Sequence, residues 1–273
     1  MEFIMMAGLD GSGRSDQAAA FGHPVVHTED EALRLLKDGI SCTLDAPNLR
    51  ARSRKAFLER IAKLPCIKRI VLTAKNVELC KQSLPEHADA IHDQYLSFYP
   101  PQPYEGWDDI TMVYSDDARF VTMDELFLGK DGLLFLSQDN PFHRHSVGMH
   151  CLRAARITAS LRPDDRTLWL ASLLHDIGKA QTKAFVDSHG QPSNTAHYYG
   201  HEFASAYESL FVRFPKAVEE KHRLRVSALI VWHMMPHHFI GNEKTRARYE
   251  RLWGRQFLED MLIIERADRE AQL

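Results

Sequence analysis

The stretch "LLHDIGKA", residues 173–180, ends an apolar helical pattern on a histidine followed directly by an aspartate. Adjacent residues on an α-helix point about 100° apart. His175 and Asp176 can therefore bind one ion only near a helix end, or where other helices supply further ligands. The pair predicts a metal site in a region built from several helices.

Composition indicates a globular protein. The 273 residues are enough for one large domain or for two domains of ordinary size. A net charge of −3 gives no overall basic field that would collect nucleic acid, although it leaves room for a local basic groove. No window approaches the ~18 apolar residues of a membrane span. The first residues lack a basic region and have only a short apolar run, so we do not expect them to act as a signal peptide. The four scattered cysteines form no CxxC pair, which indicates reduced thiols. We expect a cytoplasmic protein with no membrane segment.

The two halves of the sequence differ in periodicity. Over roughly the first 115 residues, short apolar runs alternate with helical patterns, which predicts an α/β fold. The expected strands are 3–8, 24–29, 40–45, 67–74 and 108–115, and the expected helices are 15–22, 31–39 and 50–64. Later patterns are helical, at 146–161, 165–178, 200–214, 222–235 and 258–273. The expected domains are therefore 1–115 (α/β) and 140–273 (all-α), joined by a linker over 116–139.

Further metal-ligand side chains lie on the predicted helices. Eleven of the fifteen histidines lie at or after residue 143. A single helical histidine is more often a surface or core residue than a ligand. However, a carboxylate such as Asp268 on a mostly apolar helix is costly unless it is paired or bound to a cation. His150, His175, Asp176 and Asp268 together form a mixed nitrogen and oxygen set that suits Mn, Fe, Co, Ni or Zn.

These residues, with "QDNPFHRHSVGMHCLRAA" (138–155), "HYYGHEFASA" (197–206), "VSALIVWHMMPHH" (226–238) and "ERADREA" (265–271), resemble the HD superfamily of metal-dependent phosphohydrolases. The first stretch is especially similar to HD domains of bacterial tRNA nucleotidyltransferases. The resemblance implies a helical bundle with His150, His175, Asp176 and Asp268 as ligands of a first metal. It places His201 and His233 where two-metal members bind a second ion. Ser146 stands where the family commonly has Asp.

Several nearby residues have a predicted role in phosphoryl chemistry. Asp176 can both ligate the metal and orient a water, whose proton it can accept. Lys179 is either a positive charge that holds a phosphate or a solvated lysine at a helix end. The segment His143, Arg144 and His145 either contacts the substrate or forms a polar loop that Ser146 caps. Three further histidines are expected to rim the cleft: His197, His237 and His238.

A second motif lies near the start of the chain. "GLDGSGRS" (8–15) fits G-x-x-x-x-G-K-[ST], with Arg14 at the lysine position, and lies between a predicted strand and a predicted helix. Glycines let backbone N–H groups turn inward around a phosphate, and Ser15 could ligate magnesium. The alternative is a glycine-rich turn that binds no nucleotide. The predicted nucleotide-binding residues are Gly8, Gly11, Ser12, Gly13, Arg14, Ser15 and Asp45.

"TLDAPNLRARSRKAFLERI" (43–61) and "FYPPQPYEGWDDITMV" (98–113) are similar to P-loop kinases of the polynucleotide-kinase type. The resemblance implies a kinase-like fold that binds ATP or GTP with Mg, with Asp45 and Asn48 on the acceptor side. It also implies Asp30 as general base and Arg34 as a phosphate clamp. This chain departs from the family at Arg14, in a short segment 15–42, and in a lid region (76–94) without arginine. We expect a degenerate kinase that retains nucleotide binding.

The combined hypothesis is a metal-dependent phosphohydrolase that acts on a phosphomonoester or cyclic phosphate of a nucleotide or an RNA or DNA end, as in nucleic-acid end repair. One alternative is a free-nucleotide phosphatase whose P-loop domain is a regulatory sensor. The other is a non-catalytic binding module with a structural metal, which predicts a closed site. The sequence does not define the oligomeric state.

Overall fold

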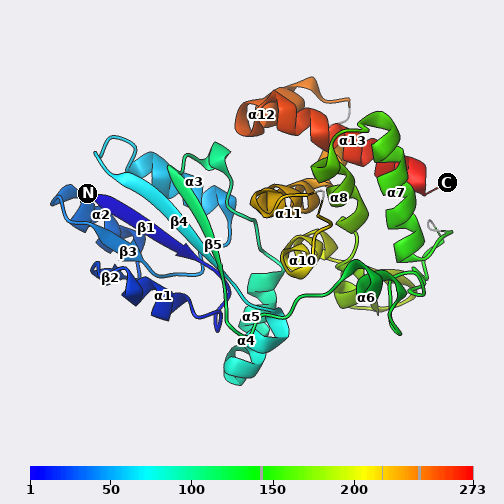
Figure 1. Cartoon of the computed structure of the whole chain (residues 1–273), viewed down its shortest axis with the longest axis horizontal. Coiled ribbons are helices and arrows are strands. Elements are labelled where there is room, and N and C mark those ends of the chain that lie inside the picture. Colours follow the sequence, from blue (N-terminus) through cyan, green and yellow to red (C-terminus); the bar gives the residue numbers. More distant parts are fainter. Residues whose placement is uncertain (142–143, 217, 239–240, 273) are drawn as a thin grey trace. The chain divides into compact units, whose positions relative to one another are not determined.

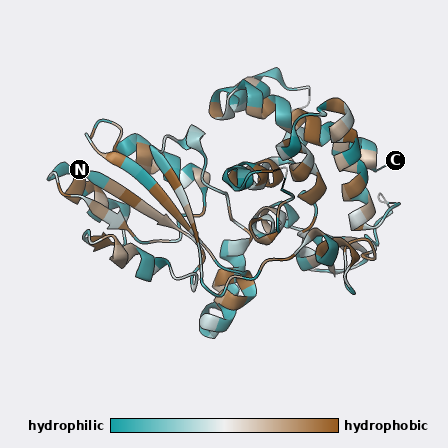
Figure 2. Cartoon of the chain, viewed as in Figure 1, coloured by the Kyte–Doolittle hydropathy of each residue, from teal (hydrophilic) through white to brown (hydrophobic). Residues whose placement is uncertain are grey.

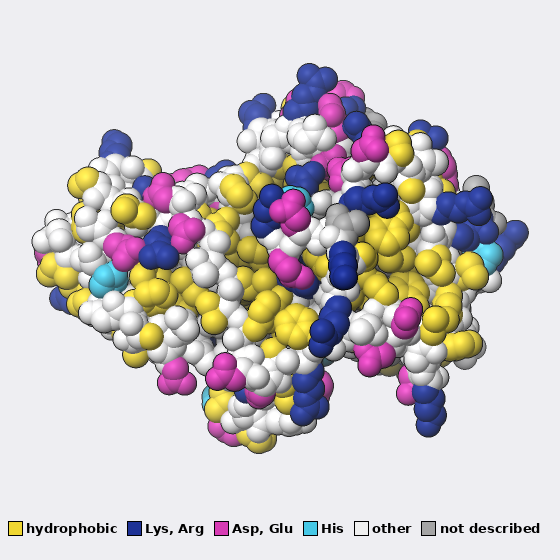
Figure 3. Space-filling view, viewed as in Figure 1, with side chains coloured by type: hydrophobic (Ala, Val, Ile, Leu, Met, Phe, Trp, Pro, Cys, Tyr) yellow, Lys and Arg dark blue, Asp and Glu magenta, His cyan; other side chains and the backbone are white. Residues whose placement is uncertain are grey.

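The computed structural model describes residues 1–141, 144–216, 218–238 and 241–272, with only the backbone of His238. The chain divides into two compact units, Met1–Arg119 and Phe120–Leu273 (Figure 1). On the face shown in Figure 3, both units carry acidic and basic side chains together, as the net charge of −3 suggests. No described helix is long and apolar enough to cross a membrane.

The first unit is built on a five-stranded parallel sheet with the order β2-β3-β1-β4-β5. The central strand β1 pairs with β4 from Glu2–Ile67 to Ala7–Leu72, and its residues 3–7 are buried. Apolar segments along these strands are visible in Figure 2. The strands are β1 (Glu2–Ala7), β2 (Val25–Val26), β3 (Cys42–Leu44), β4 (Ile67–Ala74) and β5 (Asp109–Tyr114). The sheet confirms an α/β unit and is consistent with a P-loop-like fold without being specific to it.

Helices connect these parallel strands. A capping box between Thr28 and Glu31 starts α2, and the buried Arg54 of α3 binds Glu105 through two hydrogen bonds, of 2.6 and 2.7 Å. The helices are α1 (Arg14–Ala20), α2 (Glu29–Lys37), α3 (Ala51–Arg60), α4 (Val77–Ser83) and α5 (Ala88–Tyr95). Because β1 and β3 are adjacent and parallel, the loops that follow them meet at one edge of the sheet.

The second unit is mainly helical. Helix α7 packs against α8 and α13, and small residues (Ala154, Ala267 and Ala271) form a buried cluster between α7 and α13. Helix α11 packs against α8 and α10. The helices are α6 (Met123–Leu128), α7 (Val147–Leu161), α8 (Arg166–Leu174), α9 (Lys179–Thr182), α10 (His201–Glu208), α11 (Arg223–Trp232), α12 (Glu243–Trp253) and α13 (Arg255–Ala271).

Two parts of the second unit differ from the sequence analysis. An antiparallel hairpin, β6 (Ala184–Val186) and β7 (Pro192–His197), interrupts the helices, so the unit is not all-α. Asp187 closes its turn by accepting hydrogen bonds from the N–H groups of His189 and Gln191. Helix α12 was not predicted because its residues are mostly charged and only Trp253 is buried, which leaves no apolar periodicity.

The segment 116–139, expected to be a linker, is largely part of the second unit. Val121 bridges to Val212, and residues 123–128 form α6 with a capping box at Thr122. The carbonyl of Leu133 accepts a hydrogen bond of 2.8 Å from the N–H of Gly148, and a side chain at Gly148 would collide with this segment. The segment is thereby attached to the start of α7.

Candidate metal centre

Four predicted ligands come together from three helical regions of the second unit. His150 lies within α7, Asp268 lies within α13, and all four side chains are buried. Helix α8 ends at Leu174, so His175 and Asp176 follow directly after its last turn. An adjacent pair needs such a helix end for both side chains to reach one point.

The distances from the two histidine Nε2 atoms to each other and to both carboxylates are those expected around a shared cation. His150 Nε2 lies 2.9 Å from Asp268 Oδ1, 3.2 Å from His175 Nε2 and 3.4 Å from Asp176 Oδ2. His175 Nε2 lies 3.4 Å from Asp176 Oδ2 and 3.5 Å from Asp268 Oδ1. Ligands at ~2.0–2.2 Å from an ion would stand roughly 3.0–3.5 Å apart for octahedral to tetrahedral angles. The donor set and its spacing therefore fit a transition-metal ion.

Backbone carbonyls orient three of the imidazoles in the same way. The Nδ1–H groups of His175, His201 and His233 donate to the carbonyls of Ser172, Tyr198 and Ile230, at 2.8, 2.8 and 2.7 Å. A carbonyl can only accept, so Nδ1 carries the proton in each ring. In the neutral ring, Nε2 then presents its lone pair toward the carboxylates. Lone pairs facing carboxylate oxygens need a proton or a metal ion between them.

The charges of the cluster support the same conclusion. Burial opposes ionisation of Asp176, but Lys179 and the surrounding histidines outweigh it and hold the pKa of Asp176 well below its usual range. Burial likewise opposes charge on His175, yet Asp176 and Asp268 raise its pKa to about 9. Burial and the neighbouring His175 and His201 lower the pKa of His233 to about 3. The carboxylates are thus ionised, as ligands must be.

The second oxygen of Asp176 faces the two remaining predicted ligands. Its Oδ1 lies 3.3 Å from His201 Nε2 and 4.0 Å from His233 Nε2. His175, Asp176 and His233 form a second group whose ligand atoms lie within 4.8 Å of one another. Asp176 therefore lies between two sets of nitrogen ligands, each of which faces a different oxygen.

Lys179 is buried, so it is not the solvated lysine that the sequence left as an alternative. Its Nζ lies 2.7 Å from Asp176 Oδ2 and donates to Gln138 Oε1 at 2.8 Å. Gln138 is itself buried and donates to the carbonyl of His145 at 3.1 Å. Sequence reasoning missed Gln138 because nothing local to residue 138 shows that it contacts Lys179.

A cavity of about 310 Å³ opens onto the ligands Asp176, Asp268, His201 and His233. His197 and His237 line it, as predicted for the rim, together with Asn140, Lys179, Tyr199 and Gln272. Arg144 and His145 are not among its lining residues, and Ser146 caps α7 by accepting from the N–H of Met149 at 3.3 Å. His143 and the side chain of His238 lie outside the described residues.

Residues 147–273 match the family model described as HD domain. The helical unit carries an HD domain. Proteins of this family are generally metal-dependent hydrolases, which agrees with the ligand geometry and confirms the resemblance inferred for this half of the chain. No curated protein matches the chain in sequence.

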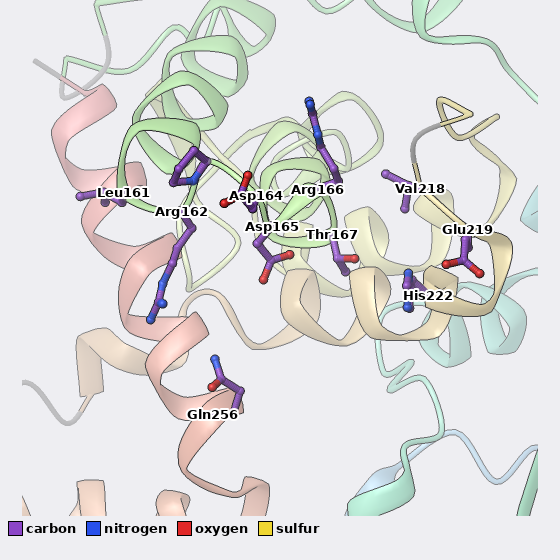
Figure 4. Close-up of a pocket in the computed structure, with 11 residues that line it drawn as sticks. Leu161, Arg162, Asp164, Asp165, Arg166, Thr167, Val218, Glu219, His222 and Gln256 are labelled. Carbon is purple, nitrogen blue, oxygen red and sulfur yellow. The ribbon is translucent and has the colours of Figure 1, made fainter.

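A second cavity in the unit that carries the HD domain, of about 660 Å³, shares no lining residue with the metal cavity (Figure 4). Acidic and basic side chains alternate around it, and Arg162 and Arg166 point away from each other. It offers no convergent set of like charges for a ligand.

The glycine-rich loop of the first unit contains the left-handed glycines that its motif predicts. Gly11 and Gly13 have φ of 80° and 83°, and a side chain at Gly11 would approach the Cys80 carbonyl to 2.8 Å. Ser12 and Ser15 are hydrogen-bonded at 2.7 Å to Thr73 and Asp45 respectively. A cavity of about 560 Å³ is lined by Leu9–Asp16 and by Lys75.

Arg14 is turned into this loop. Its Nε donates to Asp45 at 2.6 Å, and its Nη atoms donate to the Gly8 carbonyl at 2.9 Å and to Asp10 at 3.2 Å. Sequence reasoning missed Asp10, because it stands at an x position of the motif G-x-x-x-x-G-K-[ST], where the residue type does not indicate a partner. The positive charge at the lysine position of the motif is therefore already neutralised within the chain.

The predicted general base is not brought to the loop. Asp30 lies in the first turn of α2 with an 88% exposed side chain, and Arg60 donates to it at 2.5 Å. Neither Asp30 nor Arg34 lines the cavity at the glycine-rich loop. Asn48 instead supports the backbone, since its side-chain amide donates to the Met6 carbonyl at 2.7 Å.

Proposed function

We propose that this protein is a metal-dependent phosphohydrolase that acts on a phosphomonoester or cyclic phosphate of a nucleotide or nucleic-acid end. The observation that carries the proposal is the buried set of His150, His175, Asp176 and Asp268 beside an open cavity, in which the two histidine Nε2 atoms lie 2.9–3.5 Å from each other and from both carboxylates. A structural metal site is usually closed, so an opening at the ligands favours chemistry over a purely structural role.

The residues around the cation have distinct roles in this proposal. A bound metal ion would lower the pKa of a water and neutralise charge on a phosphoryl oxygen. Lys179 holds Oδ2 of Asp176 at 2.7 Å, which fixes this carboxylate while its Oδ1 faces the cavity side. Asp176 can then orient the nucleophilic water and accept its proton. His201 and His233 either bind a second ion or hydrogen-bond to the phosphate.

The glycine-rich loop supports a nucleotide-binding role for the first unit, on the strength of its backbone conformation and of Ser15. Arg14 is paired with Asp10 and Asp45, so its charge is not directed at a phosphate. This pairing supports a degenerate rather than an efficient kinase. If this unit is instead a regulatory sensor, ATP should change the phosphatase rate.

The experiment that tests the proposal is substitution of Asp176 by Ala, with metal analysis and a phosphatase screen over nucleotides and 3′-phosphate oligonucleotides. We expect loss of bound metal and of turnover, because Asp176 contacts both ligand sets. Asp164→Ala is the matched control, since Asp164 is exposed and lines the second cavity but not the metal cavity. Full metal content and a normal rate in Asp176→Ala would overturn the assignment.

A further inference from the structure

Two aromatic rings, of His197 and Tyr199, form part of the wall of the metal cavity. Their centroids are 5.5 Å apart and their planes differ by only 5°. His197 ends strand β7, and its Nε2 lies 3.2 Å from Ser193 Oγ. Tyr199 is 47% exposed. A flat ring that is supported by a parallel neighbour yet open to solvent is suited to stack on a planar ligand.

A glycine places this ring next to the metal ligands. Gly200, between Tyr199 and His201, has φ of 76°, a conformation that glycine adopts without strain. Tyr199 and His201 line the same cavity, and His201 Nε2 lies 3.3 Å from Asp176 Oδ1. Two residues of chain span at most ~7 Å, so the ring is held close to the reacting centre.

The side chain of the neighbouring Tyr198 makes contacts that the side chain of Tyr199 does not make. Its hydroxyl donates to the Gln138 carbonyl, and its ring lies 5.3 Å from Lys179 Nζ. Tyr198 thus belongs to the support of the centre. Among the described residues, the only ring or hydrogen-bond contact of the Tyr199 side chain is with His197. Its hydroxyl is therefore not required to hold the fold.

We propose that Tyr199, supported by His197, stacks on the base of the terminal nucleoside of the substrate while the phosphate reaches the metal centre. This inference rests on the proposed function and deepens it, because it makes the nucleoside the recognised part of the substrate. Every base has a π-face, so stacking of this kind accepts all four bases with little discrimination. Tyr199 is a specificity-determining residue and takes no part in the chemical step.

The test uses the metal-loaded full chain with adenosine and uridine 3′-monophosphate, and with glycerol 2-phosphate as a phosphomonoester that lacks a base. In Tyr199→Ala we expect KM for both nucleotides to rise about 10- to 100-fold, as for loss of one stacked base. We expect kcat, metal content and the kinetics with glycerol 2-phosphate to stay within a few-fold. Tyr199→Phe should keep the KM of the unmodified protein, because it keeps the ring.

Two outcomes would separate this inference from the proposed function. An equal loss for all three substrates, or a fall in metal content, would show that the ring only supports the fold and would overturn the stacking. Absence of hydrolysis by the unmodified protein would count against the proposed function alone. Calorimetric titration of adenosine 3′-monophosphate into both proteins then decides the stacking, which requires weaker binding by Tyr199→Ala. An oligonucleotide with a 3′-phosphate shows whether a free nucleotide or a nucleic-acid end is preferred.

Discussion

The metal centre and the glycine-rich loop both gather carboxylates, but they balance the negative charge differently. In the helical unit, Lys179 pairs with Asp176, and both Asp176 and Asp268 face imidazoles whose Nε2 atoms point inward. In the first unit, Asp10 and Asp45 are both bound by Arg14. The first arrangement has the ligands to hold a metal ion, whereas in the second Arg14 already neutralises the carboxylates.

This difference bears on how each site would treat a phosphate. A cation at the helical site adds positive charge next to the cavity and attracts a phosphoryl group. At the loop, Arg14 would have to leave two carboxylates before its charge could act on a phosphate. Glycine-rich geometry alone therefore does not make an efficient phosphate site, since the charges within the loop decide how strongly it attracts an anion.

The largest effect that we expect concerns phosphoryl transfer by the first unit. Purine nucleotide should bind, while transfer of its γ-phosphate to a 5′-hydroxyl oligonucleotide is slow or undetectable. A missing transition-state cation such as an arginine finger costs ~10³–10⁵ in rate. The measurement is a radiolabelled γ-phosphate assay beside calorimetric nucleotide titration. Rapid 5′-end labelling would break the comparison, because it would show that Arg14 leaves its carboxylates readily.

Arg14→Lys sharpens the same comparison. A lysine keeps one charge but cannot bridge Asp10, Asp45 and the Gly8 carbonyl as the guanidinium does. We expect at most a modest increase in transfer, since the lid region 76–94 still contains no arginine. Arg162→Lys, far outside the loop in sequence, is the matched control and should change nothing.

A smaller effect is expected at His233, which tests how many ions the helical site binds. If Asp176 bridges two ions, His233→Ala should reduce bound manganese from two ions to one per chain, because one of the two nitrogens that face Oδ1 is lost and the other, of His201, is left alone with the carboxylate. The first ion should remain, held by His150, His175, Asp176 and Asp268. One ion per chain in both proteins, with a higher KM in His233→Ala, would favour a phosphate-binding role for His233.

The sequence identified the side chains that form the buried cluster better than it identified the residues around them, for a physical reason. His175 and Asp176 can be recognised in the sequence because a polar pair ends an apolar helical pattern. Asp268 can be recognised because a carboxylate interrupts a second apolar helical pattern. Gln138 and Asp10 act through Lys179 and Arg14, which are 41 residues and 4 residues away in the chain. Such partners depend on how elements pack or loops turn, and residue type alone does not reveal them.

The same limit explains three differences from the sequence analysis, two at the edges of the helical unit and one, at Asp30, in the first unit. The hairpin β6–β7 contains few apolar residues in alternation, so its sequence resembles a loop. Segment 120–139 contains Gly129 and Gly132, which are typical of a linker, yet Phe127 and Leu133 are buried. Asp30 was chosen as a base by resemblance, and the structure pairs it with Arg60 at the surface. Local composition did not reveal these tertiary contacts.

The smallest effect that we expect is a pH dependence of the stability of the helical unit. It tests whether the buried cluster around His175 binds a cation in place of a proton. In the metal-free protein, the pKa of His175 is raised from about 6.5 to about 9, because Asp176 and Asp268 overcome the effect of burial. A raised folded-state pKa gives stability that is fully present below the unfolded value and is lost as pH rises through the folded value. The free energy of unfolding of the metal-free protein should therefore fall between pH 6.5 and 9, by ~3 kcal/mol. With metal bound, His175 is already deprotonated, so this fall should disappear, and metal affinity should instead increase over the same range.

Thermal unfolding of chelator-treated and manganese-loaded protein from pH 6 to 9.5 measures the stability of the two forms. If the stability of the two forms changed with pH in the same way, no ion would replace the proton at His175. The proposed difference between the metal centre and the glycine-rich loop would then be wrong.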